Sequence, residues 1–254
     1  KLFNDANAML DDVINNKKLT AKAVFGLFPA NREQDDLQLY TDESRTEKLM
    51  KLHQLRQQSK KPAGQFNRCL ADYVADKASG VDDYVGAFAV SAGFGVEALV
   101  KAFDAKHDDY NSILIKAVAD RLAEASAEYL HEQIRKEYWG YAADENLDND
   151  SLIREKYQGI RPAPGYPACP EHTEKGLLWQ LLNVDENIGM ELTSSFAMWP
   201  GAAVSGWYFA HPDSKYFAVA KVAQDQVESY AARKEMTMPQ AERWLSANLD
   251  YEPS

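Results

Sequence analysis

The segment from residue 160 to 172, Ile-Arg-Pro-Ala-Pro-Gly-Tyr-Pro-Ala-Cys-Pro-Glu-His, combines side chains that can hold a ligand with a stiff backbone. Arg161 offers a planar guanidinium that can bind a carboxylate through two parallel hydrogen bonds, and Tyr166 offers a ring and a hydroxyl group. Prolines at positions 162, 164, 167 and 170 fix φ and remove backbone donors, so the segment can form neither a helix nor a central strand. Such rigidity lowers the entropic cost of presenting these groups. On the residues alone, a ligand site and a structural crossover loop are equally good interpretations.

Other chemical motifs are weak. Gly93 to Ala98 reads G-x-G-x-x-A between a predicted strand and a predicted helix, but no second parallel strand ending in an acidic residue follows, so we reject a dinucleotide site. Cys169 and His172 are too few for a zinc site, and no serine or cysteine lies in a nucleophile elbow. The sequence therefore predicts no metal site and no catalytic nucleophile.

The elements that must position the 160–172 segment alternate between strand and helix patterns without a repeat. Such a pattern is typical of an α+β protein with a twisted antiparallel sheet and long flanking helices rather than a doubly wound sheet. We predict strands at 23–28 (ended by Pro29), 37–40, 70–74, 84–90, 190–193, 195–199, 205–210 and 216–222, the last two forming a hairpin. We predict helices at 1–16, 44–58, 96–103, 109–139, 151–157, 174–182, 224–234 and 238–247.

Two groups of side chains within these elements have more than one interpretation. Asp120, Glu124 and Glu128 recur at i, i+4 spacing on the longest predicted helix, which is typical of a solvated face unless a ligand or partner covers it. The aromatic residues between 196 and 217 are expected in the sheet core, although the same concentration of rings could stack on an adenine base.

Composition narrows the function classes. The 254 residues carry a net charge of −11, which argues against nonspecific nucleic-acid binding, and no apolar run approaches the length of a membrane span. Two cysteines fit a reducing cytoplasm.

Helical spacing already begins at residue 1, which is not a methionine. We therefore expect an N-terminally truncated fragment of a larger multidomain polypeptide, with residues 1–254 as one domain. Basic side chains that could meet an acidic partner occur at Arg56, Lys60, Lys61, Lys215 and Lys221.

The run Arg161 to His172 resembles the signature of the C-terminal reactivation domain of cobalamin-dependent methionine synthase. Further blocks resemble this family in the same order along nearly the whole chain: Gly26–Asn31, Leu55–Gln58, Tyr138–Tyr141, Ser195–Gly201, Val204–Phe209 and His211-Pro212.

The resemblance implies a domain of 5-methyltetrahydrofolate–homocysteine S-methyltransferase that binds S-adenosylmethionine and supports reductive methylation of cob(II)alamin to methylcobalamin. It implies two partners: flavodoxin as electron donor, and the cobalamin-binding domain of the same polypeptide. Cobalamin belongs to that other domain, and zinc belongs to the homocysteine domain, which this chain lacks. No catalytic acid or base is needed, because the reactive chemistry is the cofactor's.

The resemblance also implies roles for individual residues. Arg161 would bind the methionyl carboxylate, the backbone at Ala163 and Gly165 would meet the ligand, and Tyr216 and Phe217 would line its other side. The remaining expectations are ligand-amine contacts from Glu124 and Glu155, a cobalamin contact from Tyr166, which would also border the ligand, and a contact from Asp120 to the histidine that leaves cobalt. The family's acidic ligand-binding residue would lie upstream of Lys1.

Two other functions fit less of the sequence. One is a docking module for flavodoxin or the cobalamin domain that has lost ligand binding. The other is a free-standing methyltransferase, which would need a complete substrate pocket within this chain.

Overall fold

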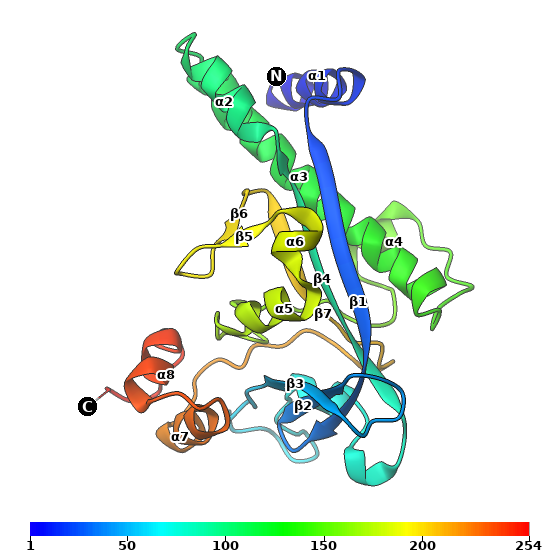
Figure 1. Cartoon of the computed structure of the whole chain (residues 1–254), viewed down its shortest axis with the longest axis vertical. Coiled ribbons are helices and arrows are strands. Elements are labelled where there is room, and N and C mark those ends of the chain that lie inside the picture. Colours follow the sequence, from blue (N-terminus) through cyan, green and yellow to red (C-terminus); the bar gives the residue numbers. More distant parts are fainter. Residues whose placement is uncertain (254) are drawn as a thin grey trace.

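The computed structural model describes residues 1–253 and contains one central sheet with helices on both faces (Figure 1). The helices are α1 (Leu2–Asn15), α2 (Val96–Asp104), α3 (Asp109–Gln133), α4 (Asn149–Ile153), α5 (Glu174–Leu182), α6 (Val184–Ile188), α7 (Gln224–Arg233) and α8 (Met238–Trp244). The strands are β1 (Thr20–Glu33), β2 (Asp36–Tyr40), β3 (Lys48–His53), β4 (Asp83–Phe94), β5 (Glu191–Leu192), β6 (Met198–Trp199) and β7 (Ala203–Tyr208). The α+β prediction is confirmed.

The central sheet is antiparallel and has the strand order β3-β2-β1-β4-β7. The strands β1 and β4 pair along most of their length, from Thr20 opposite Phe94 to Ala30 opposite Asp83. Strand β7 pairs with β4 on one side only and is therefore an edge of the sheet. Strands β5 and β6 form a separate small hairpin.

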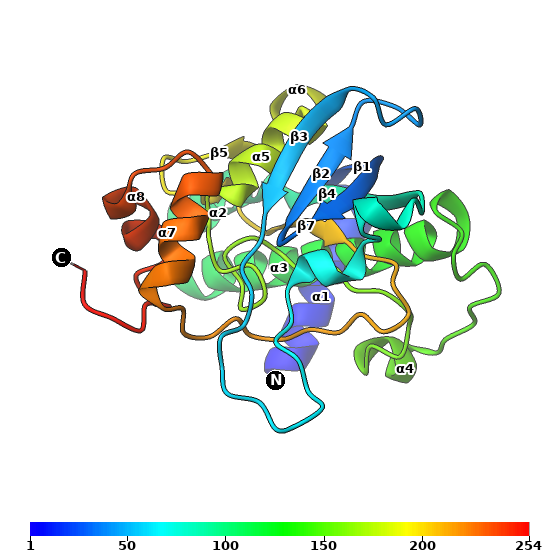
Figure 2. The same ribbon diagram turned by 90° about the horizontal axis from the view of Figure 1, so that it is seen from below.

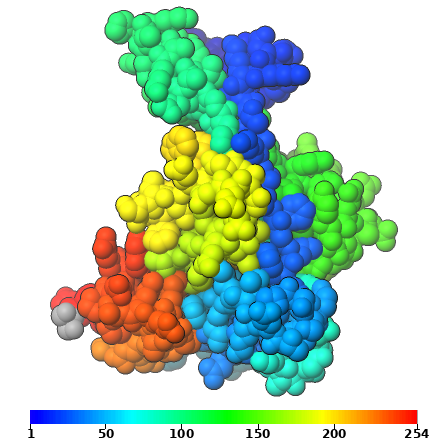
Figure 3. All heavy atoms as spheres, viewed as in Figure 1, coloured from blue at the N-terminus to red at the C-terminus, as the bar shows by residue number. Residues whose placement is uncertain are grey.

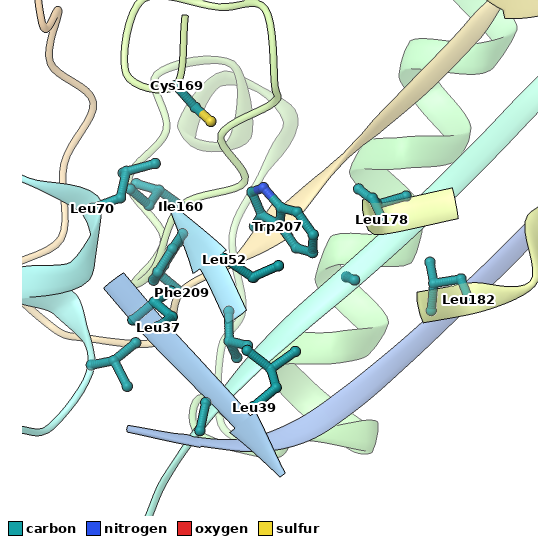
Figure 4. Packing of buried hydrophobic residues seen from close by; sticks show 14 of the residues in the cluster. Leu37, Leu39, Leu52, Leu70, Ile160, Cys169, Leu178, Leu182, Trp207 and Phe209 are labelled. Atoms are coloured by element: carbon teal, nitrogen blue, oxygen red, sulfur yellow. The ribbon is translucent and has the colours of Figure 1, made fainter. Parts of the chain in front are cut away.

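Period-two alternation along the strands divides the core into two layers. Phe88 on β4 and Tyr208 on β7 point toward α3, where their rings stack with centroids 4.5 Å apart. Ala87 and Trp207, one residue away on the same strands, point to the opposite face and pack with α5 and α6. Figure 4 shows this second layer, in which Trp207 lies among leucines from the sheet and from α5.

The C-terminal helices form a smaller satellite core beside the β2–β3 end of the sheet (Figure 2). Val227 and Tyr230 from α7 and Leu245 next to α8 pack there against Val219 and Val222. A capping box formed by Thr237 and Gln240 lies at the start of α8.

The predicted helix at 44–58 is wrong. Leu49, Leu52 and Leu55 have helical spacing, but residues 48–53 form β3, antiparallel to β2. Strand β2 is buried along its whole length, and pairing with β3 satisfies its backbone groups, which no local helix could do. Leu49 remains exposed as a consequence.

Three smaller predictions also fail. The predicted strand at 70–74 is a turn of 3-10 helix, fixed by the Asp72 carboxylate, which accepts the Cys69 N–H at 2.9 Å. Strand β1 does not end at Pro29 but runs through it to Glu33. Pro29 lies just before the first residue that pairs with β2, where a missing backbone donor is tolerated.

The predicted hairpin between 205–210 and 216–222 is absent as well. Residues 216–222 run instead beside the proline-rich segment, where Val219 N donates to Pro167 O at 2.8 Å. The free edge of β7 therefore faces residues 160–172 and not another long strand.

The outline of the molecule is notched between a projecting end and the main body (Figure 3). The projecting end contains α1 and α2, and the β5–β6 hairpin lies on the other side of the notch (Figures 1 and 3). None of the helices within residues 1–253 combines the length and apolar character needed to cross a membrane.

Candidate functional site

A cavity of about 300 Å³ lies where the proline-rich segment crosses the free edge of β7. The segment is attached to β7 by backbone hydrogen bonds: Ile160 and Phe209 each donate to the other at 3.0 Å, and Trp207 N donates to Pro162 O at 2.9 Å. A Cβ added at Gly206 would lie only 2.6 Å from Pro162 O, so the close approach depends on this glycine. The cavity is lined by Glu124, Arg161–Pro164, Tyr166–Ala168, Lys175, Met198, Ala203–Ser205, Tyr216 and Phe217.

The proline-rich segment is held in a tight turn by its own backbone. Gly165 N donates to Cys169 O at 2.7 Å, and Cys169 N donates to Tyr166 O at 2.9 Å. Gly165 has φ of 91°, and a Cβ there would lie 2.5 Å from the His172 ring. Gly165 therefore shapes the turn but does not line the cavity.

Arg161 is held in place from three sides, which leaves part of its guanidinium free. Nη1 donates to Tyr157 Oη at 3.0 Å and to His131 Nδ1 at 3.1 Å, and Nη2 lies 2.7 Å from Glu128 Oε2. Within residues 1–253, Nε–H and one Nη2–H have no protein partner. A guanidinium has five N–H donors, and its Nε and Nη2 atoms form an edge that can receive a carboxylate side-on.

His131 must be neutral to serve as this support. An arginine can only donate, so His131 Nδ1 is the acceptor and Nε2 carries the ring proton. Burial, followed by the charges of Arg135 and Arg161, holds the pKa of His131 well below its ordinary value. The ring also stacks on Tyr208, with centroids 5.0 Å apart.

A second buried guanidinium lies beneath this group. Arg135 is completely buried in a π-helical turn (Ile134–Tyr138) at the end of α3, and Nη2 lies 2.7 Å from Glu145 Oε1. Its Cζ is 4.1 Å from the centroid of the Tyr157 ring, the same tyrosine that accepts from Arg161. Tyr157 therefore links Arg161 to the buried Arg135–Glu145 pair.

Several predicted site residues come together around this cavity. Arg161, Ala163, Tyr166, Tyr216 and Phe217 line it, and the Tyr216 hydroxyl accepts the Arg161 backbone N–H at 3.0 Å. Their roles toward a ligand remain predictions.

The three acidic candidates do not lie together in the structure. Glu124 borders the cavity while forming a surface ion pair with Arg121 at 2.7 Å. Glu155 is exposed and is not part of the lining. Asp120, one helical turn before Glu124, borders a different and larger cavity of about 740 Å³.

That larger cavity lies between α2, α3 and the segment that joins β6 to β7. Gly93, Gly95 and the start of α2 form one of its walls, and Trp199 to Ala202 form another. The G-x-G-x-x-A run thus belongs to a strand-to-helix turn in an antiparallel sheet, where β4 pairs with β1 and β7.

The structure also includes residues that sequence reasoning missed. Glu128, the third member of the predicted solvated stripe, pairs with Arg161 and is only partly exposed. Lys175, Met198 and Ser205 line the cavity, yet they come from α5, β6 and β7 and carry no local sequence signal.

The remaining candidate for chemistry, Cys169, does not border the cavity. Cys169 is buried, and burial raises the pKa of its thiol well above the ordinary value. Over residues 1–253, no group of histidine, cysteine and carboxylate side chains could hold a metal ion.

Comparison with known proteins assigns the chain to a family. The family model described as vitamin B12 dependent methionine synthase, activation domain, matches residues 1–235. A solved structure of the MetH reactivation domain bound to AdoHcy is 62% identical in sequence and superposes with a TM-score of 0.96, covering 99% of this chain and 77% of that one. The chain belongs to the activation-domain family of vitamin B12 dependent methionine synthase.

Proposed function

We propose that residues 1–254 act as one S-adenosylmethionine-binding reactivation domain, with the ligand in the cavity beside Arg161. The unused donor capacity at Nε and Nη2 of Arg161 carries this proposal, because these two nitrogens form the edge of a guanidinium that suits a carboxylate. The zwitterionic end of the ligand also needs an acceptor for its ammonium group, and Glu124 borders the same cavity. The solved relative was bound to AdoHcy, which carries the same amino-acid end.

Methyl transfer needs little from the protein beyond holding the methyl donor in position. Cobalamin, held by another domain of the enzyme, would supply the nucleophile for methyl transfer. This chain's residues fix the donor at its carboxylate and border it with Tyr216 and Phe217, whose faces suit a sulfonium. Tyr166, which is two-thirds exposed and borders the cavity, would face the corrin. We further propose flavodoxin as the electron donor and the cytoplasm as the location, with methionine synthesis as the activity of the whole polypeptide.

Calorimetric titration with S-adenosylmethionine and AdoHcy tests the proposal. Replacing Arg161 by Met removes a charge-assisted pair of hydrogen bonds, and we expect the affinity to fall by about 10- to 100-fold. Arg243→Met on the exposed face of α8 is the matched control and should leave the affinity unchanged. Absence of binding to the unmodified chain would refute the ligand assignment.

A docking function without ligand is the second candidate. The larger cavity, bordered by Asp120 and the half-exposed Trp199, is a second hollow surface on which another domain could sit. Binding of the cobalamin domain that is unaffected by S-adenosylmethionine, together with no ligand binding in calorimetry, would favour this candidate.

A further inference from the structure

The block Leu55–Gln58, which follows β3, takes no part in the cavity described above. Gln57 does not border the cavity, yet only 8% of this residue is exposed. Buried polar side chains are normally hydrogen-bonded. The partners of Gln57 therefore indicate what the block does.

Gln57 connects two segments that are far apart in the chain. Its backbone N–H donates to Arg68 O at 2.9 Å, and its side-chain Oε1 accepts from Arg68 N at 3.2 Å. Its Nε2 donates to Ala218 O at 2.7 Å. One partner is a donor and the other an acceptor, so the network fixes the orientation of the amide. Ala218 directly follows Phe217, which borders the cavity.

The wall formed by Tyr216 and Phe217 has little regular structure to hold it. Residues 214–221 are neither helix nor strand. In the part of the chain that the structure describes, Val219 is the only residue of 215–221 whose N–H reaches another backbone group, Pro167 O at 2.8 Å. The backbone of such a segment is held by side chains instead. The position of the wall therefore depends on the side chains that bind its carbonyl groups.

A second side chain binds this segment on the other side of the wall. Tyr73 Oη donates to Lys215 O at 3.2 Å, and Tyr73 is itself buried and does not border the cavity. The carbonyl groups of Lys215 and Ala218 flank Tyr216 and Phe217. Both residues of the wall thus lie between two anchored carbonyl groups.

We propose that Gln57 and Tyr73 are positioning residues for ligand binding, an inference that rests on the proposed function. They hold Tyr216 and Phe217 at the cavity before the ligand arrives, which lowers the entropic cost of binding. Gln57 is the stronger anchor, because its bond to the wall is shorter. The coupling is reciprocal, so a bound ligand must also hold the wall in place.

Calorimetric titration with AdoHcy tests the effect on affinity. Gln57→Glu lacks the donor for Ala218 O but keeps an acceptor for Arg68 N, whereas Gln57→Met lacks both. We expect the affinity to fall by about 10-fold in each, and by about 3-fold in Tyr73→Phe. Gln65→Glu, on an exposed side chain, is the matched control and should bind as the unmodified chain does. Thermal melting followed by circular dichroism confirms that each variant is folded.

Amide hydrogen exchange separates positioning from a general loss of stability. Without ligand, the Val219 N–H should exchange about 10-fold faster in both Gln57 variants, while amides in the centre of β4 such as that of Phe88 keep their rates. Saturating AdoHcy should reduce the difference at Val219, because the ligand holds the same wall.

Three results would overturn the inference. The first is an unchanged Val219 exchange rate in both Gln57 variants. The second is faster exchange with unchanged AdoHcy affinity. The third is weaker binding in Gln57→Met but not in Gln57→Glu, which would assign the effect to Arg68. If the unmodified chain does not bind AdoHcy, the proposed function fails, and the exchange rates without ligand still decide whether Gln57 holds the wall.

Discussion

The buried ion pair between Arg135 and Glu145 offers the sharpest test of how the ligand site is supported. Arg135 is completely buried, and Nε donates to Glu145 Oε2 at 2.9 Å while Nη2 donates to Oε1 at 2.7 Å. The next carboxylate, Glu128, lies 3.9 Å away and is already paired with Arg161. Glu145→Gln keeps the size of the side chain but removes the charge that compensates a buried guanidinium.

The expected loss in the free energy of unfolding depends on the acceptors that Arg135 keeps after the substitution. Removing one partner of a buried ion pair costs about 3–5 kcal/mol of the free energy of unfolding, because the other charge stays buried. Glutamine retains one carbonyl acceptor, and Glu128 supplies partial compensation, so we expect about 3 kcal/mol. For a chain of this size, that loss lowers the melting temperature by about 6–12 °C.

Urea unfolding followed by circular dichroism measures the change, with Glu132→Gln on α3 as the control. Glu132 pairs with Lys136 at 3.3 Å, but both side chains are about one-third exposed, so its loss should cost less than about 0.5 kcal/mol. If Glu145→Gln cost no more than Glu132→Gln, the view that this pair compensates a buried charge would be refuted.

Two further predictions concern the loop and the buried histidine. Gly206→Ala should push the proline-rich segment from β7, because the new Cβ would meet Pro162 O, and ligand affinity should fall by about 10-fold or more in calorimetry. Gly201→Ala, whose Cβ would meet nothing within 4 Å, should leave affinity unchanged, and equal effects of the two substitutions would contradict the reasoning. His131 has a lowered folded-state pKa, so below its unfolded value the unfolded chain binds more protons and stability falls as the pH is lowered from 7 to 5. His131→Gln should flatten that fall, by at most about 1.4 kcal/mol per pH unit in urea titrations, and an unchanged pH profile would count against a neutral His131.

Local sequence patterns predicted the elements whose partners are near in the chain. The helix predicted at 174–182 matches α5, and the helix predicted at 109–139 covers α3 and the π-helical turn that follows it. Patterns failed where a distant partner decided the outcome. Residues 48–53 are a strand because β2 needs a neighbour, and residues 216–222 are not one because the proline-rich segment occupies the edge of β7.

The sequence by itself determined the stiffness of the 160–172 segment, since proline and glycine restrict or extend the backbone wherever they lie. It also identified Arg161 as the group for a carboxylate and, through family blocks, the class of domain. Only the tertiary structure decided which donors of Arg161 stay free, because Glu128, His131 and Tyr157 approach it from α3 and from the chain that leads into the segment. It alone brought Lys175 and Ser205 to one cavity from α5 and β7. Burial and hydrogen-bond pairing depend on contacts between residues far apart in the chain, and no local pattern encodes them.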